Sequence, residues 1–396
     1  MKYLDLVILA GGKGTRIRNY TKNNPKPLAK IADYVFLDLL LGNVSKYHFR
    51  KIFILAGYKG DKIYKKYHNK NINFINIQCF IEKKPLGTGG ALKLIKKKLT
   101  NNFFVINGDT IADFDFYEMI KLKKRNSAVL ALTKSSFSSE GNKIRNLTFD
   151  SKKLLKINHS KQKNFKSAGV YLFSKSNLNV TSKNKFSLED NIILPLIKKN
   201  KVHAYSKNFF FYDIGTKNDF LNAKKKLIKY LRKTAIFFDR DNTINYDEGY
   251  TYKYKNFKFI NNAIKALKYI SKKNTYIFIV TNQAGIAKGY FSEHDFISLH
   301  VRLKKEFIKK KIFINEVKYC PYHPKAKYKK YRKKTSLRKP GNLMISQIIE
   351  NWVVNKKKSL MIGDKISDQE CAKKSNLNFQ FVKKDLFKQI KNIKLD

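Results

Sequence analysis

The sequence predicts two α/β domains, each with a parallel-rich sheet between two layers of helices. Both halves of the 396-residue chain alternate short apolar stretches with longer helical stretches, a pattern typical of parallel strands joined by helices. The length suits two domains of about 150 to 200 residues each. We expect the first domain to span residues 1–232 and the second residues 233–396.

The first predicted strand, Leu4–Ala10, ends in a glycine-rich loop, Gly11–Arg18. Its three glycines let the main chain fold closely around phosphates and present N–H groups to them, while Lys13 and Arg16 add positive charge. The loop lacks both the Gly-Lys-Ser/Thr ending of a Walker loop and the GxGxxG spacing of a dinucleotide-binding fold. Alone, it indicates phosphate binding and no particular reaction.

Further phosphate-site and metal-site residues follow along the first half. Asn24–Leu28, NPKPL, places Lys26 between two prolines on a stiff, extended segment. Asp109 and Asp213 each follow an apolar, strand-like stretch. Because strand ends of a parallel sheet meet at one edge, these two carboxylates can come together and hold Mg²⁺ on the α-phosphate of a nucleotide.

These segments resemble the sugar-1-phosphate nucleotidyltransferase family, whose signature is a GGxGTR loop followed by PKP. Within that family the likeness is to the D-glycero-D-manno-heptose 1-phosphate guanylyltransferases. Further blocks fall in the family's order: EKKPLGTGGALK (Glu82–Lys93), INGDTIADFD (Ile106–Asp115), FSLED (Phe186–Asp190) and FYDIGTKNDF (Phe211–Phe220). Without this order, the same glycines would indicate ordinary turns and helix N-termini.

The resemblance implies Mg²⁺-dependent transfer of a nucleotidyl group, with GTP as donor, to a sugar 1-phosphate. It implies Asp109 and Asp213 as metal ligands, and Arg16 and Lys26 as the charges that neutralise the triphosphate. The nucleotide-binding residues that it implies are Ala10, Gly11, Gly12, Gly14, Thr15, Gly87, Thr88 and Gly108. Many relatives carry a sugar-binding Glu-Lys pair before the AGVY segment. Residues 154–165 lack this pair, so the pattern says less about the acceptor sugar than about the reaction.

The join between the predicted domains reads as one amphipathic helix, Lys217–Lys233, that runs directly into the next strand. No Gly, Ser or Pro linker separates the helix from that strand. We therefore expect the two domains to pack against each other and not to swing freely.

The second half opens with Ala235–Thr243, AIFFDRDNT, in which a short apolar strand presents Asp239 and Asp241 at its carboxyl end. Two carboxylates at this spacing suit a divalent cation and a phosphate. Asp239 can attack phosphorus, and Asp241 can protonate the leaving oxygen and later activate water. An ordinary Asp-rich turn has the same local pattern. The later segments must therefore decide between a phosphate site and a turn.

Three later blocks complete a second resemblance: YIFIVTNQAGIAKGYF (Tyr276–Phe291), SLRKPG (Ser336–Gly341) and SLMIGDKISD (Ser359–Asp368). With DRDNT they resemble the haloacid dehalogenase superfamily of phosphatases. More narrowly, they resemble the subgroup that contains heptose 1,7-bisphosphate 7-phosphatases and histidinol phosphatases. The chain thus resembles a nucleotidyltransferase fold followed by a haloacid dehalogenase-like fold, both Rossmann-like.

The second resemblance implies Asp239 as nucleophile and Asp241 as general acid and base. Thr281 and Lys339 would steady the transferring phosphoryl group, and a Mg²⁺ ion would be held by Asp239, Asp364 and the main-chain carbonyl of Asp241. Thr281 and Asp364 both follow apolar runs, which places them at the same sheet edge as Asp239. The further residues predicted to contact a substrate phosphate are Asn282, Arg338 and Lys365.

Two positions depart from the phosphatase pattern. Asn242 stands where the family usually has Gly, and Asn tolerates left-handed backbone better than most residues. Relatives often bind structural zinc between residues 320 and 338, through Cys-x-His and then Cys-x-Cys. Here Cys320 and His323 are the candidate ligands, while Thr335 and Leu337 stand at the later thiolate positions. Two ligands cannot close a tetrahedral site, so we predict no zinc.

The formal net charge of +55 would ordinarily suggest nucleic-acid binding. Lys is spread through nearly every segment, which indicates a compositional bias and not a binding stripe, so we predict no specific nucleic-acid partner. The field would still attract triphosphates and sugar phosphates. Three cysteines form no disulfide framework, and no apolar run is long enough to cross a bilayer. We expect a cytoplasmic protein; an oligomer is possible.

Three hypotheses follow. The first is a bifunctional enzyme that hydrolyses the 7-phosphate of D-glycero-D-manno-heptose 1,7-bisphosphate and activates the resulting heptose 1-phosphate as a nucleoside-diphosphate sugar for a surface polysaccharide. The second keeps both reactions but changes the substrates, for example to another sugar 1-phosphate and to histidinol phosphate. The third is a basic nucleic-acid-binding protein on degenerate enzyme domains, which would show no Mg²⁺-dependent turnover.

Overall fold

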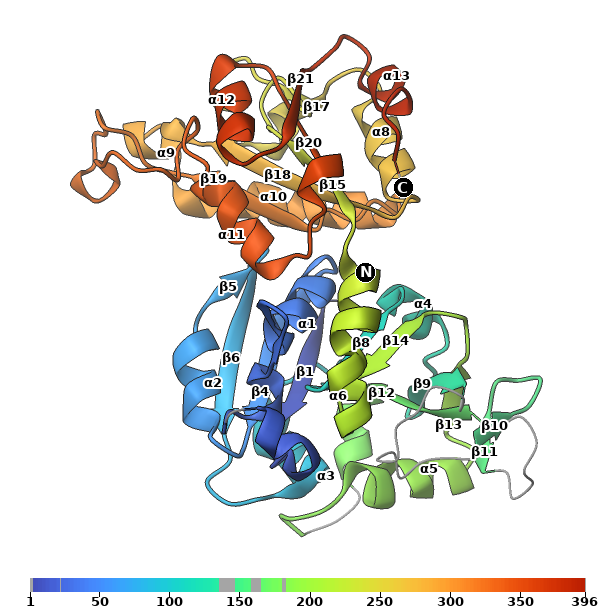
Figure 1. The fold of residues 1–396 in the computed structure, drawn as a ribbon. Helices are drawn as coiled ribbons and strands as arrows, with labels where there is room; N and C mark the ends of the chain where they lie inside the picture. The colour runs from blue at the N-terminus through green and yellow to red at the C-terminus, as the bar shows by residue number, and fades with distance from the viewer. Residues whose placement is uncertain (1–2, 22, 135–146, 158–164, 180–182, 396) are drawn as a thin grey trace. The chain divides into compact units, whose positions relative to one another are not determined.

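The computed structural model describes residues 3–21, 23–134, 147–157, 165–179 and 183–395 (Figure 1). Contacts within the chain divide it into two compact units. The first consists of Met1–Asn43 and Phe49–Leu227, and the second of Val44–His48 and Ile228–Asp396. The domain boundary after residue 232 stays a prediction.

The first unit is built on a mixed sheet whose four central strands are parallel. They pair in the order β7 (Asn102–Asn107), β1 (Leu4–Ala10), β4 (Phe49–Ala56) and β6 (Ile75–Ile81). Antiparallel pairing extends both edges, with β5 beside β6 and β12 beside β7. The outer strands are β5 (Asn71–Ile72), β9 (Ala128–Lys134), β10 (Leu147–Phe149), β11 (Leu155–Ile157), β12 (Phe165–Ser174) and β13 (Val202–Tyr205).

Smaller elements of the first unit surround this sheet. Strands β8 (Thr110–Asp113) and β14 (Phe210–Asp213) form a separate antiparallel pair, as do β2 (Lys30–Ile31) and β3 (Tyr34–Val35). The helices are α1 (Phe36–Ser45), α2 (Gly60–Tyr67), α3 (Gly87–Ile95), α4 (Phe116–Lys121), α5 (Leu194–Lys198) and α6 (Lys217–Ala223). After α6 the helical path continues through a π-helical segment, Lys224–Ile228, and α7 (Lys229–Leu231).

The second unit has a parallel five-stranded sheet in the order β19-β18-β15-β20-β21. Its strands are β15 (Thr234–Phe238), β18 (Thr275–Asn282), β19 (Glu316–Cys320), β20 (Leu360–Gly363) and β21 (Asn378–Phe381). Two short strands, β16 (Asn245–Tyr246) and β17 (Lys258–Phe259), pair separately. The helices are α8 (Ala263–Ile270), α9 (Ala284–Lys288), α10 (Glu293–Lys309), α11 (Leu343–Asn351), α12 (Ile366–Lys374) and α13 (Leu386–Lys391).

Strand β15 lies at the centre of this sheet and is buried on both faces. Alternate side chains of a strand point to opposite faces: Ile236 and Phe238 belong to a core shared with α8, α10 and α13. Ala235 and Phe237 belong to a second core, shared with α11 and α12. The second unit is therefore a three-layer α/β domain, and the predicted parallel-rich α/β class is confirmed.

Within the described residues, no helix combines the length and the apolar character that a membrane-spanning segment requires.

Candidate active sites

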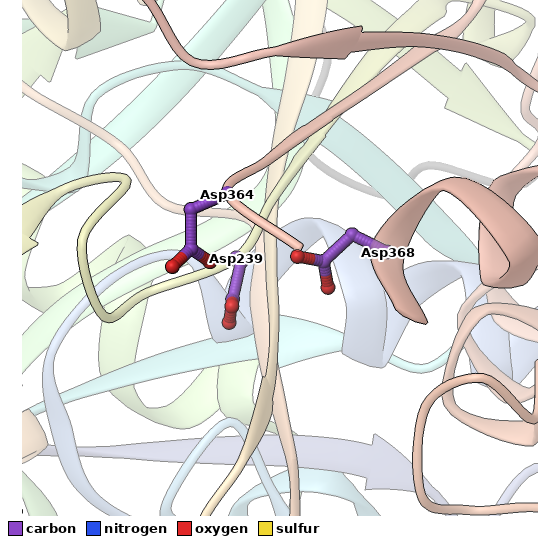
Figure 2. Close-up of side chains that lie close together, drawn as sticks. All are labelled: Asp239, Asp364 and Asp368. Atoms are coloured by element: carbon purple, nitrogen blue, oxygen red, sulfur yellow. The ribbon is translucent and has the colours of Figure 1, made fainter. Parts of the chain in front are cut away.

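Three carboxylates converge at the carboxyl edge of the second sheet. Asp239 follows β15, Asp364 follows β20, and Asp368 lies in the first turn of α12. One oxygen of each lies within 4.8 Å of one oxygen of the other two. Figure 2 shows the three side chains gathered together. Adjacent parallel strands place Asp239 and Asp364 together, as the sequence predicted. Asp368 was not predicted, although it stands at the end of the quoted block SLMIGDKISD.

The ammonium group of Lys339 is enclosed by this cluster. Its Nζ lies 2.8 Å from Asp239 Oδ1 and 2.7 Å from Asp368 Oδ1, and donates to the Val280 carbonyl at 2.9 Å. Burial would lower the pKa of Lys339, but Asp239 and Asp368 raise it above its ordinary value. The site therefore holds a fixed positive charge directly beside the predicted nucleophile.

Asp241, the predicted general acid, accepts hydrogen bonds from three side chains. Arg240 Nε donates to Oδ1 at 2.8 Å, Gln283 Nε2 donates to Oδ2 at 2.9 Å, and Asn245 Nδ2 donates to Oδ1 at 3.3 Å. Burial raises the pKa of Asp241; Arg240 lowers it and Asp239 raises it, and the net direction is upward. A carboxyl group that retains its proton more readily is suited to act as a general acid.

The remaining predicted residues of this site have different surroundings. Gln283 Nε2 also donates to Thr281 Oγ1 at 3.0 Å, so one amide connects Thr281 with Asp241. The Asn282 amide bonds both the N–H and the carbonyl of Lys339, which fixes the loop that carries Lys339. Arg338 Nη1 is buried and has no hydrogen-bond partner within the described residues. Lys365 is exposed, with Nζ 3.9 Å from Asp364 Oδ2.

The carboxylate cluster fits a divalent cation. Asp364 Oδ1 is buried without a hydrogen-bond partner in the described part of the chain. Burial and the neighbouring charge of Asp239 raise the pKa of Asp364. A hard cation such as Mg²⁺ takes oxygen ligands and would relieve the repulsion between these groups.

Asn242, with φ of 55°, adopts the left-handed backbone conformation in the loop beside the cluster.

The loop at residues 320–338 is held by hydrogen bonds to helices α9 and α10, and the end of β19 shares one of the acceptors. Glu293 at the start of α10 accepts from the hydroxyl groups of Tyr319, at 2.5 Å, and Tyr331, at 3.0 Å. The Lys327 N–H bonds the Ala287 carbonyl at 2.9 Å, which ties the loop to α9. These contacts can order the loop although its zinc-ligand set is incomplete. The predicted absence of zinc stays a prediction.

In the first unit, a cavity of about 600 Å³ opens at the carboxyl ends of the central strands. Most of the predicted nucleotide-site residues line it together: Ala10, Gly11, Gly12, Gly14, Lys26, Gly87, Thr88, Gly108 and Asp109. Thr15 and Arg16 do not line the cavity. They begin an exposed 3-10 turn, Thr15–Tyr20, and their predicted roles in nucleotide binding stay predictions.

Lys26 and the two predicted metal ligands form one electrostatic group. Lys26 Nζ forms an ion pair with Asp109 Oδ2. Burial and the charge of Asp109 raise the pKa of Asp213 to about 7, although Lys26 opposes this shift. Thr110 Oγ1 donates to Asp213 Oδ2 at 3.3 Å. Two carboxylates that repel each other in this way suit a divalent cation.

Two glutamates also line this cavity and were not predicted as site residues. Glu189, from the FSLED block, accepts from Thr88 and Ser187 at 3.3 Å and from Tyr171 at 3.4 Å. Glu82 accepts from the Leu86 N–H at 3.1 Å. Their blocks were recognised in the sequence, but no signal there distinguished a carboxylate that faces the cavity from one that faces solvent. Part of the stretch without the Glu-Lys pair, residues 158–164, lies outside the described residues.

Fold and sites together define a chain with two phosphate-handling centres, each at the carboxyl edge of its own sheet. A family model for nucleotidyl transferases matches residues 6–230, more than half of the chain. A family model for haloacid dehalogenase-like hydrolases matches residues 312–382. Both matches fall in the regions where the sequence predicted them.

Two named phosphatases are similar to less than half of this chain, and one solved structure covers more than half of it. The D-glycero-beta-D-manno-heptose-1,7-bisphosphate 7-phosphatase of Haemophilus influenzae is 39% identical over 138 residues, which cover 35% of this chain and 74% of the relative. The D-glycero-alpha-D-manno-heptose-1,7-bisphosphate 7-phosphatase of Campylobacter jejuni is 32% identical over 170 residues, 41% of this chain and 94% of the relative. The crystal structure of HddC from Yersinia pseudotuberculosis, 28% identical, covers 57% of this chain and 99% of its own, with a TM-score of 0.49.

The chain therefore belongs to the nucleotidyl transferase family through its first unit and to the haloacid dehalogenase-like phosphatases through its second. It is an enzyme of two classes, a nucleotidyltransferase and a phosphomonoesterase, and both resemblances drawn from the sequence are confirmed.

Proposed function

We propose that the second unit hydrolyses the 7-phosphate of D-glycero-D-manno-heptose 1,7-bisphosphate and that the first unit transfers a nucleotidyl group from GTP to the resulting heptose 1-phosphate. This proposal rests on one observation: a phosphatase unit and a nucleotidyl transferase unit stand in the same chain. The relatives that this chain covers over most of their length are heptose 1,7-bisphosphate 7-phosphatases. In this chain the phosphatase unit follows a nucleotidyl transferase unit. The expected phosphatase product is a sugar 1-phosphate, the acceptor class of the first unit.

The phosphatase step begins with Asp239 as nucleophile. Its carboxylate attacks phosphorus, a P–O bond to Asp239 forms, and the P–O bond to the sugar breaks. Asp241 gives its proton to the departing sugar oxygen. Water then attacks the aspartyl phosphate, its proton returns to Asp241, and inorganic phosphate leaves.

The surroundings of Asp239 favour this chemistry. Lys339, in contact with Asp239, offsets the negative charge of the incoming phosphate. Gln283 and Arg240 orient the Asp241 carboxyl. Arg338, Asn282 and Lys365 complete the proposed phosphate site, and Arg338 Nη1 is buried with no hydrogen-bond partner in the part of the chain that the structure describes. Mg²⁺, held by Asp239, Asp364 and the Asp241 carbonyl, would supply charge neutralisation between an anionic nucleophile and an anionic substrate.

In the first unit, the phosphate oxygen of the sugar 1-phosphate attacks the α-phosphorus of the nucleotide and the bond to pyrophosphate breaks. Lys26 and Arg16 are proposed to neutralise the triphosphate, and the glycine loop, with Thr15 and Thr88, is proposed to hold it. Asp109 and Asp213 would hold Mg²⁺, which neutralises the α-phosphate. We place both reactions in the cytoplasm, where nucleoside triphosphates are available.

A direct test supplies purified chain with Mg²⁺ and one phosphate ester at a time. The esters are the α and β anomers of the heptose 1,7-bisphosphate, histidinol phosphate and a hexose 1-phosphate. Phosphate release fastest from a heptose bisphosphate, measured as kcat/KM, supports the proposal. Histidinol phosphate as the best substrate would refute it. Because named relatives include both anomers, the test compares them side by side. Chelation of Mg²⁺ with EDTA is expected to stop both reactions.

A further inference from the structure

A second cavity of the first unit opens at the amino end of β7 and has a volume of about 410 Å³. Its walls come from the start of β7, the end of β12, the residues directly after β12, and the turn between α4 and β9. Four cations line it, and its other described lining residues are asparagines and serines. The cations are Lys123, Lys124, Arg125 and Lys175.

Strand β7 separates this cavity from the reacting groups of the first unit. Its first residue, Asn102, lines the cavity, whereas Asn107 at its other end and Asp109 just beyond it line the nucleotide cavity. Seven residue steps of extended chain amount to about 23 Å. A molecule bound at the amino end of β7 would therefore lie too far from Asp109 to be a reactant in the nucleotidyl transfer.

The charges around this cavity have one sign. In a lysine-rich chain the arrangement of cations matters more than their number, and the nucleotide cavity offers the comparison. Among its described lining residues that cavity has two lysines, Lys13 and Lys26, and three carboxylates. The cavity at β7 has four cations and no carboxylate among the lining residues that the structure describes. A concave surface of this kind attracts anions.

Lys123 is fixed in the wall of the cavity by neutral partners. Its Nζ donates to Ser174 Oγ at 2.7 Å and to the Lys124 carbonyl at 3.0 Å, and Ser174 Oγ donates to Asn102 Oδ1 at 3.0 Å. The side chain is half-buried, and burial lowers the pKa of Lys123 to about 8. An ammonium group has three donors, so one N–H of Lys123 is left for a ligand. A partly desolvated cation gains most from an anionic partner.

We propose that this cavity binds a phosphorylated small molecule, whose phosphoryl oxygens accept hydrogen bonds from Lys123 and from the three neighbouring cations. Arg125 offers the forked donors that match phosphate oxygens, and the lysines add point charges. The volume lies within the range of cavities that take small organic ligands, about 300 to 1,000 Å³, so the ligand extends beyond a single phosphate. This site goes beyond the proposed function and does not depend on it.

Protection of lysines from chemical acylation tests the site directly on the full chain. A trace of amine-acylating reagent is added at physiological ionic strength, and mass spectrometry gives the labelling of each lysine with and without a probe. The probes, used singly, are inorganic phosphate, pyrophosphate and a hexose 1-phosphate. At about ten times the dissociation constant, labelling of Lys123, Lys124 and Lys175 should fall about tenfold. Labelling of Lys13 and Lys26 reports the nucleotide cavity separately.

A pair of double variants separates this cavity from the general positive field of the chain. Lys124→Gln with Arg125→Gln removes two exposed cations of the lining. The dissociation constant, read from the labelling of Lys175, should rise about 10- to 100-fold, as for the loss of hydrogen bonds between charged groups. Lys65→Gln with Lys97→Gln removes the same charge from exposed positions elsewhere in the first unit. Salt screens such distant charges, so this control should change the constant less than about twofold.

Protection by any of the three probes, lost in the first double variant and kept in the second, supports the site. The probe that binds most tightly then identifies whether the ligand is an inorganic phosphate or a phosphate ester. Absence of protection by all three probes would overturn the proposal, as would equal weakening in both double variants. Protection by a single-stranded RNA and by none of the small probes would also overturn it, because the cavity would then belong to a nucleic-acid-binding surface.

Discussion

The two active sites differ in how their charges are balanced before any substrate binds. In the second unit, Lys339 is 1% exposed and contacts Asp239 and Asp368, which are 8% and 1% exposed. In the first unit, Lys26 and Asp109 are 12% and 27% exposed at an open cavity, and Asp213 has its pKa raised to about 7. In the phosphatase site a buried lysine neutralises part of the carboxylate charge, and repulsion remains at Asp364. In the transferase site the lysine and its partner are more exposed to solvent, and repulsion remains at Asp213.

This difference matches the two reactions. The aspartyl phosphate that we propose for the second unit would have to meet water only in the correct position, so a buried, fixed charge beside Asp239 would be useful. The transferase has to admit a nucleoside triphosphate and a sugar phosphate together, which an enclosed ion cluster would prevent.

The independence of the two sites is tested by reciprocal substitutions. Asp239→Asn should lower phosphate release by roughly 1000-fold or more, because the nucleophile is lost, and should leave pyrophosphate release within about twofold. Asp109→Asn should do the reverse. Both products are measured on the same preparation, with heptose 1-phosphate as acceptor for the pyrophosphate assay. Loss of both activities in one well-folded variant would contradict two separate sites.

The contrast in burial predicts unequal costs of removing each lysine. Lys339→Met leaves Asp239 and Asp368 buried without their partner and should destabilise the second unit by about 3 to 5 kcal/mol. Lys26→Met should cost no more than about 1 kcal/mol, because water reaches its partner. Urea unfolding followed by Trp352 fluorescence measures the second unit, since Trp352 is the single tryptophan and lies there. Unfolding of the first unit is followed by hydrogen exchange.

Equal destabilisation by the two lysine substitutions would remove the distinction between a closed and an open site. Lys365→Met, which alters an exposed lysine beside Asp364, serves as the stability control within the second unit and should change the Trp352 transition little.

A smaller effect is expected from the amide that connects Thr281 with Asp241. Gln283→Leu removes both hydrogen bonds with little change in volume, so Asp241 is oriented less well. We expect kcat for phosphate release to fall about 10- to 100-fold, with pyrophosphate release unchanged. Gln283→Glu should not restore activity, because a second carboxylate would repel Asp241. Full activity in Gln283→Leu would show that Arg240 and Asn245 position Asp241 without Gln283.

The smallest predicted effect concerns the loop at residues 320–338. Tyr331→Phe removes one of the two hydroxyl groups that bond Glu293, and should lower the stability of the second unit by about 1 kcal/mol. The Trp352 unfolding transition measures this change. Zinc chelation should leave that transition where it is, and elemental analysis should find no stoichiometric zinc. One bound zinc per chain would mean that the loop has ligands we did not identify.

Much of both sites could be predicted from the sequence because their residues follow apolar strands. Asp239 and Asp364 end neighbouring parallel strands, and the topology alone brings them together. The glycine loop could be placed for the same reason, because it follows β1, whereas Lys26 was placed from the two prolines that flank it. The edges of the first sheet were not predicted: its antiparallel strands β12 and β5 depend on pairings between distant segments that strand patterns do not specify.

Residues that act through their neighbours were harder to predict. Asp368 reaches Lys339 only because α12 begins directly after Asp364 and turns its first residues toward β15. Asn282 was predicted to contact a substrate phosphate, yet its amide bonds the main chain of Lys339; a substrate contact stays a prediction. Arg16 and Thr15 belong to the recognised motif but lie outside the cavity lining, which depends on how the 3-10 turn packs.

The central claim is that one chain runs two consecutive reactions at two sites. The most direct test supplies the purified chain with D-glycero-D-manno-heptose 1,7-bisphosphate, Mg²⁺ and each nucleoside triphosphate in turn, and follows phosphate and pyrophosphate separately. We predict that phosphate appears first, and that pyrophosphate follows after a lag and with GTP alone. Pyrophosphate release without prior phosphate release, or release of phosphate with no pyrophosphate from any nucleotide, would contradict the claim.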